Sequence, residues 1–357
     1  MPKICVDAIE MMEQNFPNDK IAEVLKIKYP QEQIDMTDFT NQLIDMNIVE
    51  SIDGDIIDQQ VINESPKDFQ GVPIKLGQWY FNKRTMSLYF LILVINVAIF
   101  IIQPELFPHY KDLFLFDSMI MNTLLYSGIT FVILLHHEWG HILAARSYGL
   151  ATKLEIGHRL FLIVLQTDLT PTWKLQPKQR LVPYLGGLLF DNIILFIALI
   201  SSLISSNPIF QGIMAVIIFD IFIKFIYQCS VFMKTDLYYV LENLTGCYNL
   251  MESGKKWISE KISIVKTTSN DVLYETEKKF VRFYAVFYLF SVALTMSLFV
   301  FYFVPQLLFV FNNTVPQLFN SVNSTSFWDA IGFILTTIIM ISLLLYSWTK
   351  KYILKKD

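Results

Sequence analysis

The stretch TLLYSGITFVILLHHEWGH, residues 123–141, joins a long uncharged apolar run to a cluster of histidines and a glutamate. An apolar run of this length predicts a helix that crosses a membrane. The chain has only five histidines, and three of them lie at the end of this run, where burying an unpaired polar side chain costs free energy. Ionisable side chains within a membrane span indicate a functional site.

The chain beyond residue 84 has the composition of a membrane protein. Apolar residues make up 54% of the sequence, which contains thirty phenylalanines, and they are concentrated in long uncharged stretches. Runs of about 20 apolar residues each predict one span. The predicted spans cover residues 86–103, 119–141, 181–203, 209–231, 283–304 and 327–348. The expected fold class is an all-α polytopic membrane protein with about six transmembrane helices.

The distribution of Lys and Arg predicts the orientation of these helices. The first eighty-odd residues are polar and have no leading apolar segment, so we expect the N-terminus to stay in the cytosol. The outward loops 104–118, 204–208 and 305–326 then contain one basic residue, Lys111, whereas the inward loops contain many. We therefore expect an integral membrane protein with both termini in the cytosol. The expected location is the bacterial plasma membrane.

The N-terminal part has its own charge and its own hydrophobic pattern. Residues 1–74 carry fifteen acidic and five basic residues, whereas the remainder carries seventeen and twenty-three. Apolar residues at helical spacing predict three helices, and alternation around Asp53-Gly54 predicts a short hairpin. We predict a winged-helix-like cytosolic domain over residues 1–60. Its negative charge would repel phosphate groups, so nucleic acid is not an expected partner.

The remaining boundaries follow from the spans. Residues 61–84 are predicted as a linker and interfacial segment, 85–118 as the first transmembrane helix with its outer loop, 119–250 as a core of three transmembrane helices with a cytosolic hairpin, 251–282 as a cytosolic loop, and 283–357 as two further transmembrane helices and a basic tail. The cysteines Cys5, Cys229 and Cys247 lack Cys-x-x-Cys spacing, so we expect neither a disulfide framework nor a thiolate metal site.

The residues HEWGH, 137–141, have the spacing of a metal site. His137 and His141 are four residues apart, so on a helix both imidazoles face the same side and can reach one metal ion. Glu138 lies beside them, where its carboxylate can take a proton from the attacking water. His136 cannot replace His137 in this motif, because the residue four positions later is Gly140.

Two histidines leave a catalytic zinc ion one protein ligand short of the usual three. The carboxylates near membrane segments are Asp168, Asp191, Asp220 and Asp236. The motif lies near the cytosolic end of the second span, and Asp236 follows the fourth span at that end. Asp220 lies about 24 Å earlier along a helix, where it can pair with Lys224, one turn further on. Asp191 begins the third span and stays a rival ligand, whereas Asp168 lies in a loop and suits a turn.

Two stretches resemble the site-2 proteases, which are intramembrane zinc metalloproteases. HEWGHILAARSYG, residues 137–149, resembles the signature helix of that family, which an Asp completes two spans later, and Asp236 follows span four. GGLLFDN, residues 186–192, resembles the Gly-rich middle helix, so the resemblance implies a substrate-binding role for Asn192. Helix packing accounts for Asn192 equally well. The resemblance covers roughly residues 119–245, although the usual Asp-Gly pair is Asp236-Leu237 here.

LEIGHRLF, TDLTPTWKL and KTDLYYVLEN, which start at residues 154, 167 and 234, resemble the peptide zinc metalloprotease branch of this family. Members of that branch are linked to the maturation of ribosomally made, modified peptides. The resemblance implies Zn²⁺ bound by His137, His141 and Asp236, with Glu138 as general base. It also implies a peptide or membrane-protein substrate, contact with membrane lipid, and a leader peptide as a partner of the N-terminal domain.

Two other functions stay open. One is a regulatory site-2 protease that releases a membrane-tethered transcription regulator. The other is a noncatalytic peptide export or immunity partner, which would gain nothing from Glu138. Residues 152–169 alternate between apolar and polar and predict strands on the cytosolic side, whose edge can receive an extended substrate. The alternative for this segment is an interfacial hairpin without a substrate role.

Overall fold

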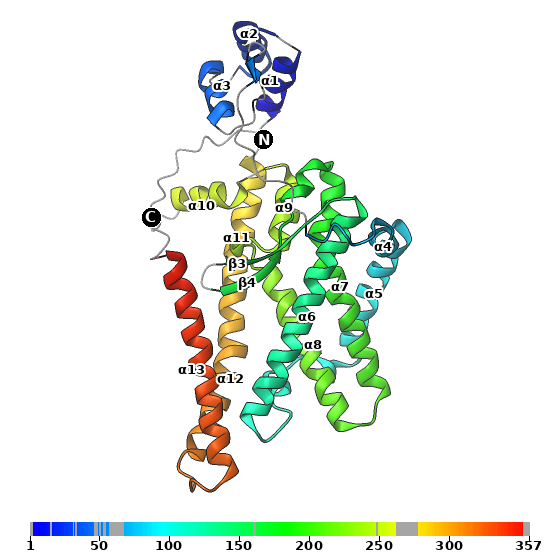
Figure 1. The fold of residues 1–357 in the computed structure, drawn as a ribbon, viewed down its shortest axis with the longest axis vertical. Coiled ribbons are helices and arrows are strands. Elements are labelled where there is room, and N and C mark those ends of the chain that lie inside the picture. Colours follow the sequence, from blue (N-terminus) through cyan, green and yellow to red (C-terminus); the bar gives the residue numbers. More distant parts are fainter. Residues whose placement is uncertain are drawn as a thin grey trace. The chain divides into compact units, whose positions relative to one another are not determined.

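The computed structural model describes residues 3–14, 16–30, 32, 34–45, 49, 51–52, 55–56, 68–159, 162–247, 249–261 and 278–352. These residues are mostly helical, and the chain forms two compact units, Met1–Ser65 and Pro66–Asp357 (Figure 1). Each unit has its own hydrophobic core.

The first unit contains three helices and a short hairpin. The helices are α1 (Lys3–Glu13), α2 (Asn18–Lys28) and α3 (Met36–Asp45), and β1 (Ser51–Ile52) pairs antiparallel with β2 (Asp55–Ile56). Ile21 and Leu25 of α2 are fully buried against Ala8 and Met36, as their spacing of one helical turn requires. The elements therefore occur in the order that the apolar spacing predicts. The residues of the turn itself, Asp53 and Gly54, lie outside the described residues.

Six helices in the described part of the second unit are long and apolar enough to cross a membrane. They are α5 (Lys83–Ile102), α6 (Met119–Ser147), α7 (Pro177–Ile204), α8 (Pro208–Gln228), a continuous helical segment formed by α11 (Lys278–Leu298), a π-helical turn (Phe299–Phe303) and α12 (Val304–Gln317), and α13 (Thr325–Tyr352). Each predicted span corresponds to one of them. The expectation of an all-α polytopic membrane protein is therefore confirmed.

Shorter elements connect and cover these helices. They are α4 (Ile74–Tyr80), the antiparallel strands β3 (Leu154–Arg159) and β4 (Leu162–Thr167), α9 (Asp236–Thr245), α10 (Leu250–Lys261), and short 3-10 turns at Pro104–Leu106, Tyr110–Leu113, Thr170–Lys174 and Val231–Met233. Helix α4 lies in the segment predicted as a linker, and α10 lies in the predicted cytosolic loop. The structure therefore has a helix in each of two segments for which the sequence predicts no helix.

The predicted outward loop 305–326 is wrong over most of its length. Residues 305–317 continue the helix that begins at Lys278, and only residues 318–324 connect it to α13. Pro305 lies in the first turn of α12, directly after the π-helical turn. Proline has no backbone N–H to donate, and the wider winding of that turn accommodates it within the helical segment. The apolar run from Leu307 to Phe311 then extends the helix. The whole helical segment from Lys278 to Gln317 has 40 residues and is therefore about 60 Å long, roughly twice the thickness of the hydrocarbon core of a bilayer.

Glycines allow helix α6 to be approached closely on two sides. A Cβ atom at Gly140 would lie 2.4 Å from the carbonyl oxygen of Gly186, so α6 and α7 are in backbone contact there. A Cβ atom at Gly77 of α4 would lie 2.6 Å from the carbonyl oxygen of Leu143. Close approach of this kind is what small residues provide between membrane helices. Helices α6 and α7, which run side by side in Figure 1, thereby position the histidine motif.

Candidate metal centre

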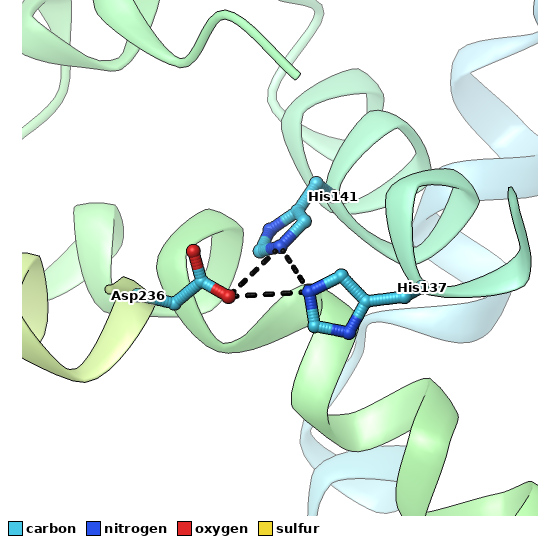
Figure 2. A group of neighbouring side chains, drawn as sticks. All are labelled: His137, His141 and Asp236. Carbon is cyan, nitrogen blue, oxygen red and sulfur yellow. Dashed lines mark hydrogen bonds and ion pairs between the residues drawn. The ribbon is translucent and has the colours of Figure 1, made fainter. Parts of the chain in front are cut away.

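The histidine motif and Asp236 meet inside the second unit. His137 and His141 project from the same face of α6, and Asp236 begins α9, directly across from them (Figure 2). Nε2 of His137 lies 3.1 Å from Nε2 of His141, and Oδ2 of Asp236 lies 3.2 Å and 3.4 Å from these two atoms. All three residues are buried. Among the described residues they form a group that could hold a metal ion.

The other nitrogen of each imidazole has an acceptor as its partner. Nδ1 of His141 lies 2.7 Å from the backbone carbonyl oxygen of Pro183, and Nδ1 of His137 lies 2.7 Å from Oδ2 of Asp191. A carbonyl or carboxylate oxygen can only accept, so Nδ1 carries the proton in both rings. In a neutral imidazole, Nε2 then presents a lone pair. This pattern of acceptors behind the ligands is typical of metal-binding histidines.

The donor atoms have the spacing that zinc requires. Ligands about 2.0–2.1 Å from a tetrahedral ion lie about 3.3 Å from one another. The three observed separations, 3.1, 3.2 and 3.4 Å, agree with that value. Two lone pairs and a carboxylate oxygen this close together repel one another unless a cation lies among them. The residues present therefore fit a metal ion with two nitrogen ligands and one oxygen ligand.

Gln228, the last residue of α8, holds Asp236 in place. Its amide nitrogen donates to Oδ2 of Asp236 at 2.7 Å, and its side-chain oxygen accepts from the Asp236 backbone N–H at 3.0 Å. Lys234 adopts a left-handed conformation, with φ of 53°, in the turn between α8 and α9.

Glu138 is buried beside the ligands and is held by the hairpin. Oε2 of Glu138 accepts a hydrogen bond from Oγ1 of Thr167, the last residue of β4, at 2.7 Å. Glu138, His141 and Asp236 line a cavity of about 210 Å³ together with residues of β4 and the segment after it. Trp173, Tyr184 and Tyr239 are its aromatic wall. The carboxylate therefore faces a space that is open to a ligand.

The other candidate carboxylates have different partners. Asp191 lies behind His137 and contacts the nitrogen that faces away from Asp236, so it orients a ligand. Asp220 pairs with Lys224 at 2.7 Å, as the sequence predicts. Oδ1 of Asp168 accepts from the Thr170 backbone N–H in a turn. Of the four candidates, only Asp236 joins the two histidines.

Asn192 lies away from the metal centre. Its amide nitrogen donates to the Tyr89 carbonyl oxygen at 3.0 Å, and its side-chain oxygen accepts from the Asn96 amide at 2.9 Å. Both partners belong to α5, and Asn192 is buried between the helices. These are the contacts of helix packing, the second of the two roles considered for Asn192. The structure does not bring Asn192 to the ligands or to the cavity beside Glu138.

Sequence reasoning missed Thr167 and Gln228. Thr167 lies 29 residues from Glu138, and although it begins the TDLTPTWKL stretch, the sequence does not indicate its contact with Glu138. Gln228 lies eight residues before Asp236, at the end of an apolar helix, where a polar residue signals only a boundary. Cys5, Cys229 and Cys247 form no disulfide with one another; Cys5 and Cys229 are partly buried, and Cys247 is buried.

No family model matches the chain, and no curated protein and no solved structure matches it. The geometry of the metal centre therefore carries the functional assignment. It combines a buried His-His-Asp group, an adjacent carboxylate and a cavity beside them, within a protein that has six membrane-spanning candidates. Such a set can activate water next to a bound peptide.

Proposed function

We propose that this chain is an intramembrane zinc metalloprotease of the site-2 protease type. The observation that carries this proposal is the oxygen acceptor at Nδ1 of each imidazole, from which we infer that the Nε2 lone pair of each ring points towards the Asp236 carboxylate beside Glu138. A protein that only binds peptide would have no use for a buried carboxylate that lies next to a metal site and is not itself a ligand. The reaction is hydrolysis of a peptide bond near the cytosolic membrane face.

His137, His141 and Asp236 would hold the zinc ion. A bound zinc ion supplies Lewis acidity, which polarises the peptide carbonyl and makes water a better nucleophile. Glu138 accepts the proton of the attacking water and returns it to the leaving amine. Thr167 holds Oε2 of Glu138, which leaves Oε1 to carry the proton.

The hairpin provides a route by which an extended peptide reaches Glu138. Within the described residues, β4 pairs only with β3, so its other edge has no strand partner. Residues 166–169, at the end of β4, line the cavity that contains Glu138 and His141. A peptide that adds as a strand along this edge would pass the proposed base. Strand addition also keeps the backbone groups of the unwound substrate hydrogen-bonded.

The N-terminal unit suits a winged-helix-like module that captures a substrate. Its three helices and hairpin, together with its strongly negative charge, favour a peptide partner such as a basic leader segment over a nucleic acid. The Lys and Arg distribution supports a cytosolic location for this unit and for both termini. The substrate is then a ribosomally made peptide, or, in the alternative, a membrane-tethered regulator.

Peptide cleavage by the purified full chain tests this proposal. Zinc-loaded protein in detergent is incubated with labelled single-span peptides, and the products are identified by mass. We expect cleavage by the parent, loss of cleavage after chelation, and recovery when zinc is restored. Glu138→Gln should bind the same amount of zinc and cleave at least a hundredfold more slowly, because general bases contribute about 10²–10⁴ to rate. Undiminished cleavage by Glu138→Gln would show that the base is another group.

A further inference from the structure

An ion pair lies within the apolar helix α8. Nζ of Lys224 lies 2.7 Å from Oδ2 of Asp220, and Oδ1 of Asp220 accepts from Oγ1 of Thr130, on α6, at 2.7 Å. The Asp220 side chain is 2% exposed, whereas the Lys224 side chain is 24% exposed. Charged groups within a membrane span are costly and indicate a function. The catalytic roles proposed above use neither residue.

The pair lines a second cavity, which reaches the metal centre from the other side. This cavity has a volume of about 370 Å³, and its lining includes Lys224, Asp220, His137, Glu138 and Asp236. Its remaining wall is largely apolar and includes side chains from α6, α8 and β4: Leu134, Ile223, Val164 and Leu165. The ion pair and the proposed base therefore line the same cavity.

Lys224 is the member of the pair that can meet a ligand. Its ammonium group has three N–H donors, of which one reaches Asp220 and a second makes a long contact of 3.5 Å with the Thr130 carbonyl oxygen. Asp220 is enclosed by Thr130 and Lys224, so its part is to fix the ammonium group. The ion pair thus presents a charged hydrogen-bond donor to this cavity.

The charges of the cavity exclude an acidic ligand group. The lining contains four carboxylates, Glu138, Asp191, Asp220 and Asp236, against the single cation Lys224. Even with a divalent metal ion bound, the lining of the cavity carries one more negative charge than positive charges. An uncharged acceptor, such as a carbonyl oxygen, meets the Lys224 donor without that repulsion. A peptide that unwinds in a membrane frees carbonyl oxygens that need such a donor.

We propose that the Asp220–Lys224 pair is a substrate subsite, in which Lys224 donates a hydrogen bond to an uncharged carbonyl oxygen of the peptide segment beside the scissile bond. This inference rests on the proposed protease function. The carbonyl belongs either to the unwound backbone or to an Asn or Gln side chain, because the two share the same acceptor chemistry. The cavity therefore favours substrates that unwind readily or that carry such a side chain near the cut.

Peptide binding to the inactive Glu138→Gln protein tests the subsite without cleavage. The probes are three labelled single-span peptides, a Leu/Ala host and the same host with one central Asn or one central Asp. Affinity is measured by fluorescence anisotropy in detergent. The Asn peptide should bind at least as well as the host, and the Asp peptide should bind more weakly than the Asn peptide. Tightest binding of the Asp peptide would overturn the choice of an uncharged acceptor.

The decisive variant, in the same background, combines Lys224→Met with Asp220→Asn, which leaves no unpaired buried charge. It should weaken binding about tenfold, because a hydrogen bond from a charged donor is lost. Equal weakening for the host and Asn peptides identifies the backbone as the source of the carbonyl, and weakening for the Asn peptide alone identifies the side chain. Lys153→Met is the matched control, since Lys153 also forms an ion pair, with Glu155 at 2.9 Å, but lies outside this cavity.

Unchanged affinity of a zinc-binding, folded double variant for both peptides would overturn the subsite. These measurements distinguish an error in the proposed protease function from an error in the proposed subsite. If the parent with Glu138 intact cleaves the host peptide while the double variant binds it normally, the subsite is wrong and the protease function stands. If affinity falls in the double variant but the parent cleaves none of the peptides, the cavity binds peptide and the protease function is wrong.

Discussion

Nδ1 of His137 lies 2.7 Å from Oδ2 of Asp191, on the side of the ring opposite to Asp236. This relationship decides between the two carboxylates that the sequence leaves as rivals for the third ligand position. A carboxylate bound to Nδ1 fixes the ring and its tautomer, and it strengthens Nε2 as a ligand. Asp191 therefore belongs behind the metal centre and Asp236 within it.

Removal of the Thr167 hydroxyl should slow the proposed reaction without removing the metal. Thr167→Val keeps the side-chain shape but leaves Oε2 of Glu138 without its donor at 2.7 Å. Hydrogen bonds to charged groups contribute about 1.5–3 kcal/mol, so we expect the cleavage rate to fall about ten- to a hundredfold. The measurement is kcat for a labelled peptide together with zinc content.

Thr336→Val is the matched control for this change, because the Thr336 hydroxyl bonds only to the Gly332 carbonyl of its own helix, α13. The control should cleave at the rate of the parent. A normal rate in Thr167→Val would show that Glu138 does not depend on the hairpin for its position.

The contact between α6 and α7 should not tolerate a methyl group. In Gly140→Ala the new Cβ would lie 2.4 Å from the Gly186 carbonyl oxygen, so the helices must separate. Overpacking of this kind costs about 1–3 kcal/mol, which predicts a melting temperature several degrees lower in detergent. Gly128→Ala, in the same helix, has no neighbouring atom within 4 Å and should not lower the melting temperature. Equal melting temperatures for the two variants would contradict the close approach.

Sequence patterns account for the six long helices and for two of the three residues of the metal centre. Long apolar runs predict the spans because only a helix satisfies its own backbone in lipid. The pair His137 and His141 is predicted because four residues is about one helical turn. The third ligand comes from a different helix, so depth along the spans supports Asp236 but leaves Asp191 open. Contacts between distant segments, such as Thr167 with Glu138, depend on packing that no local pattern encodes.

Two features show where local patterns mislead. Pro305 follows directly after the predicted span 283–304, yet the helix continues through residues 305–317 because the π-helical turn accommodates Pro305. Asn192 lies in a segment that resembles a substrate-binding helix, yet its side chain bonds to α5. In both cases the deciding neighbour is a structural element that the local sequence does not reveal.

Asn192 should matter for stability and not for metal binding. Asn192→Leu removes the hydrogen bonds to the Tyr89 carbonyl oxygen and the Asn96 amide, at a cost of about 1–3 kcal/mol. Asn96→Leu removes the other side of the same contact and should lower the melting temperature by a similar amount. Both variants should keep the zinc content of the parent. A stable Asn192→Leu protein that binds peptide more weakly would instead restore a substrate role for Asn192.

Metal content per chain tests the central claim most directly. The detergent-purified parent should carry about one zinc ion, and Asp236→Ala should carry almost none, because the third ligand is lost. Asp191→Ala should still bind zinc at saturation, with an affinity about ten- to a hundredfold lower, since only the partner of His137 is removed. A folded, zinc-supplied parent without zinc would contradict the metal centre. Loss of zinc at saturation in Asp191→Ala, together with retention in Asp236→Ala, would contradict the assignment of the third ligand.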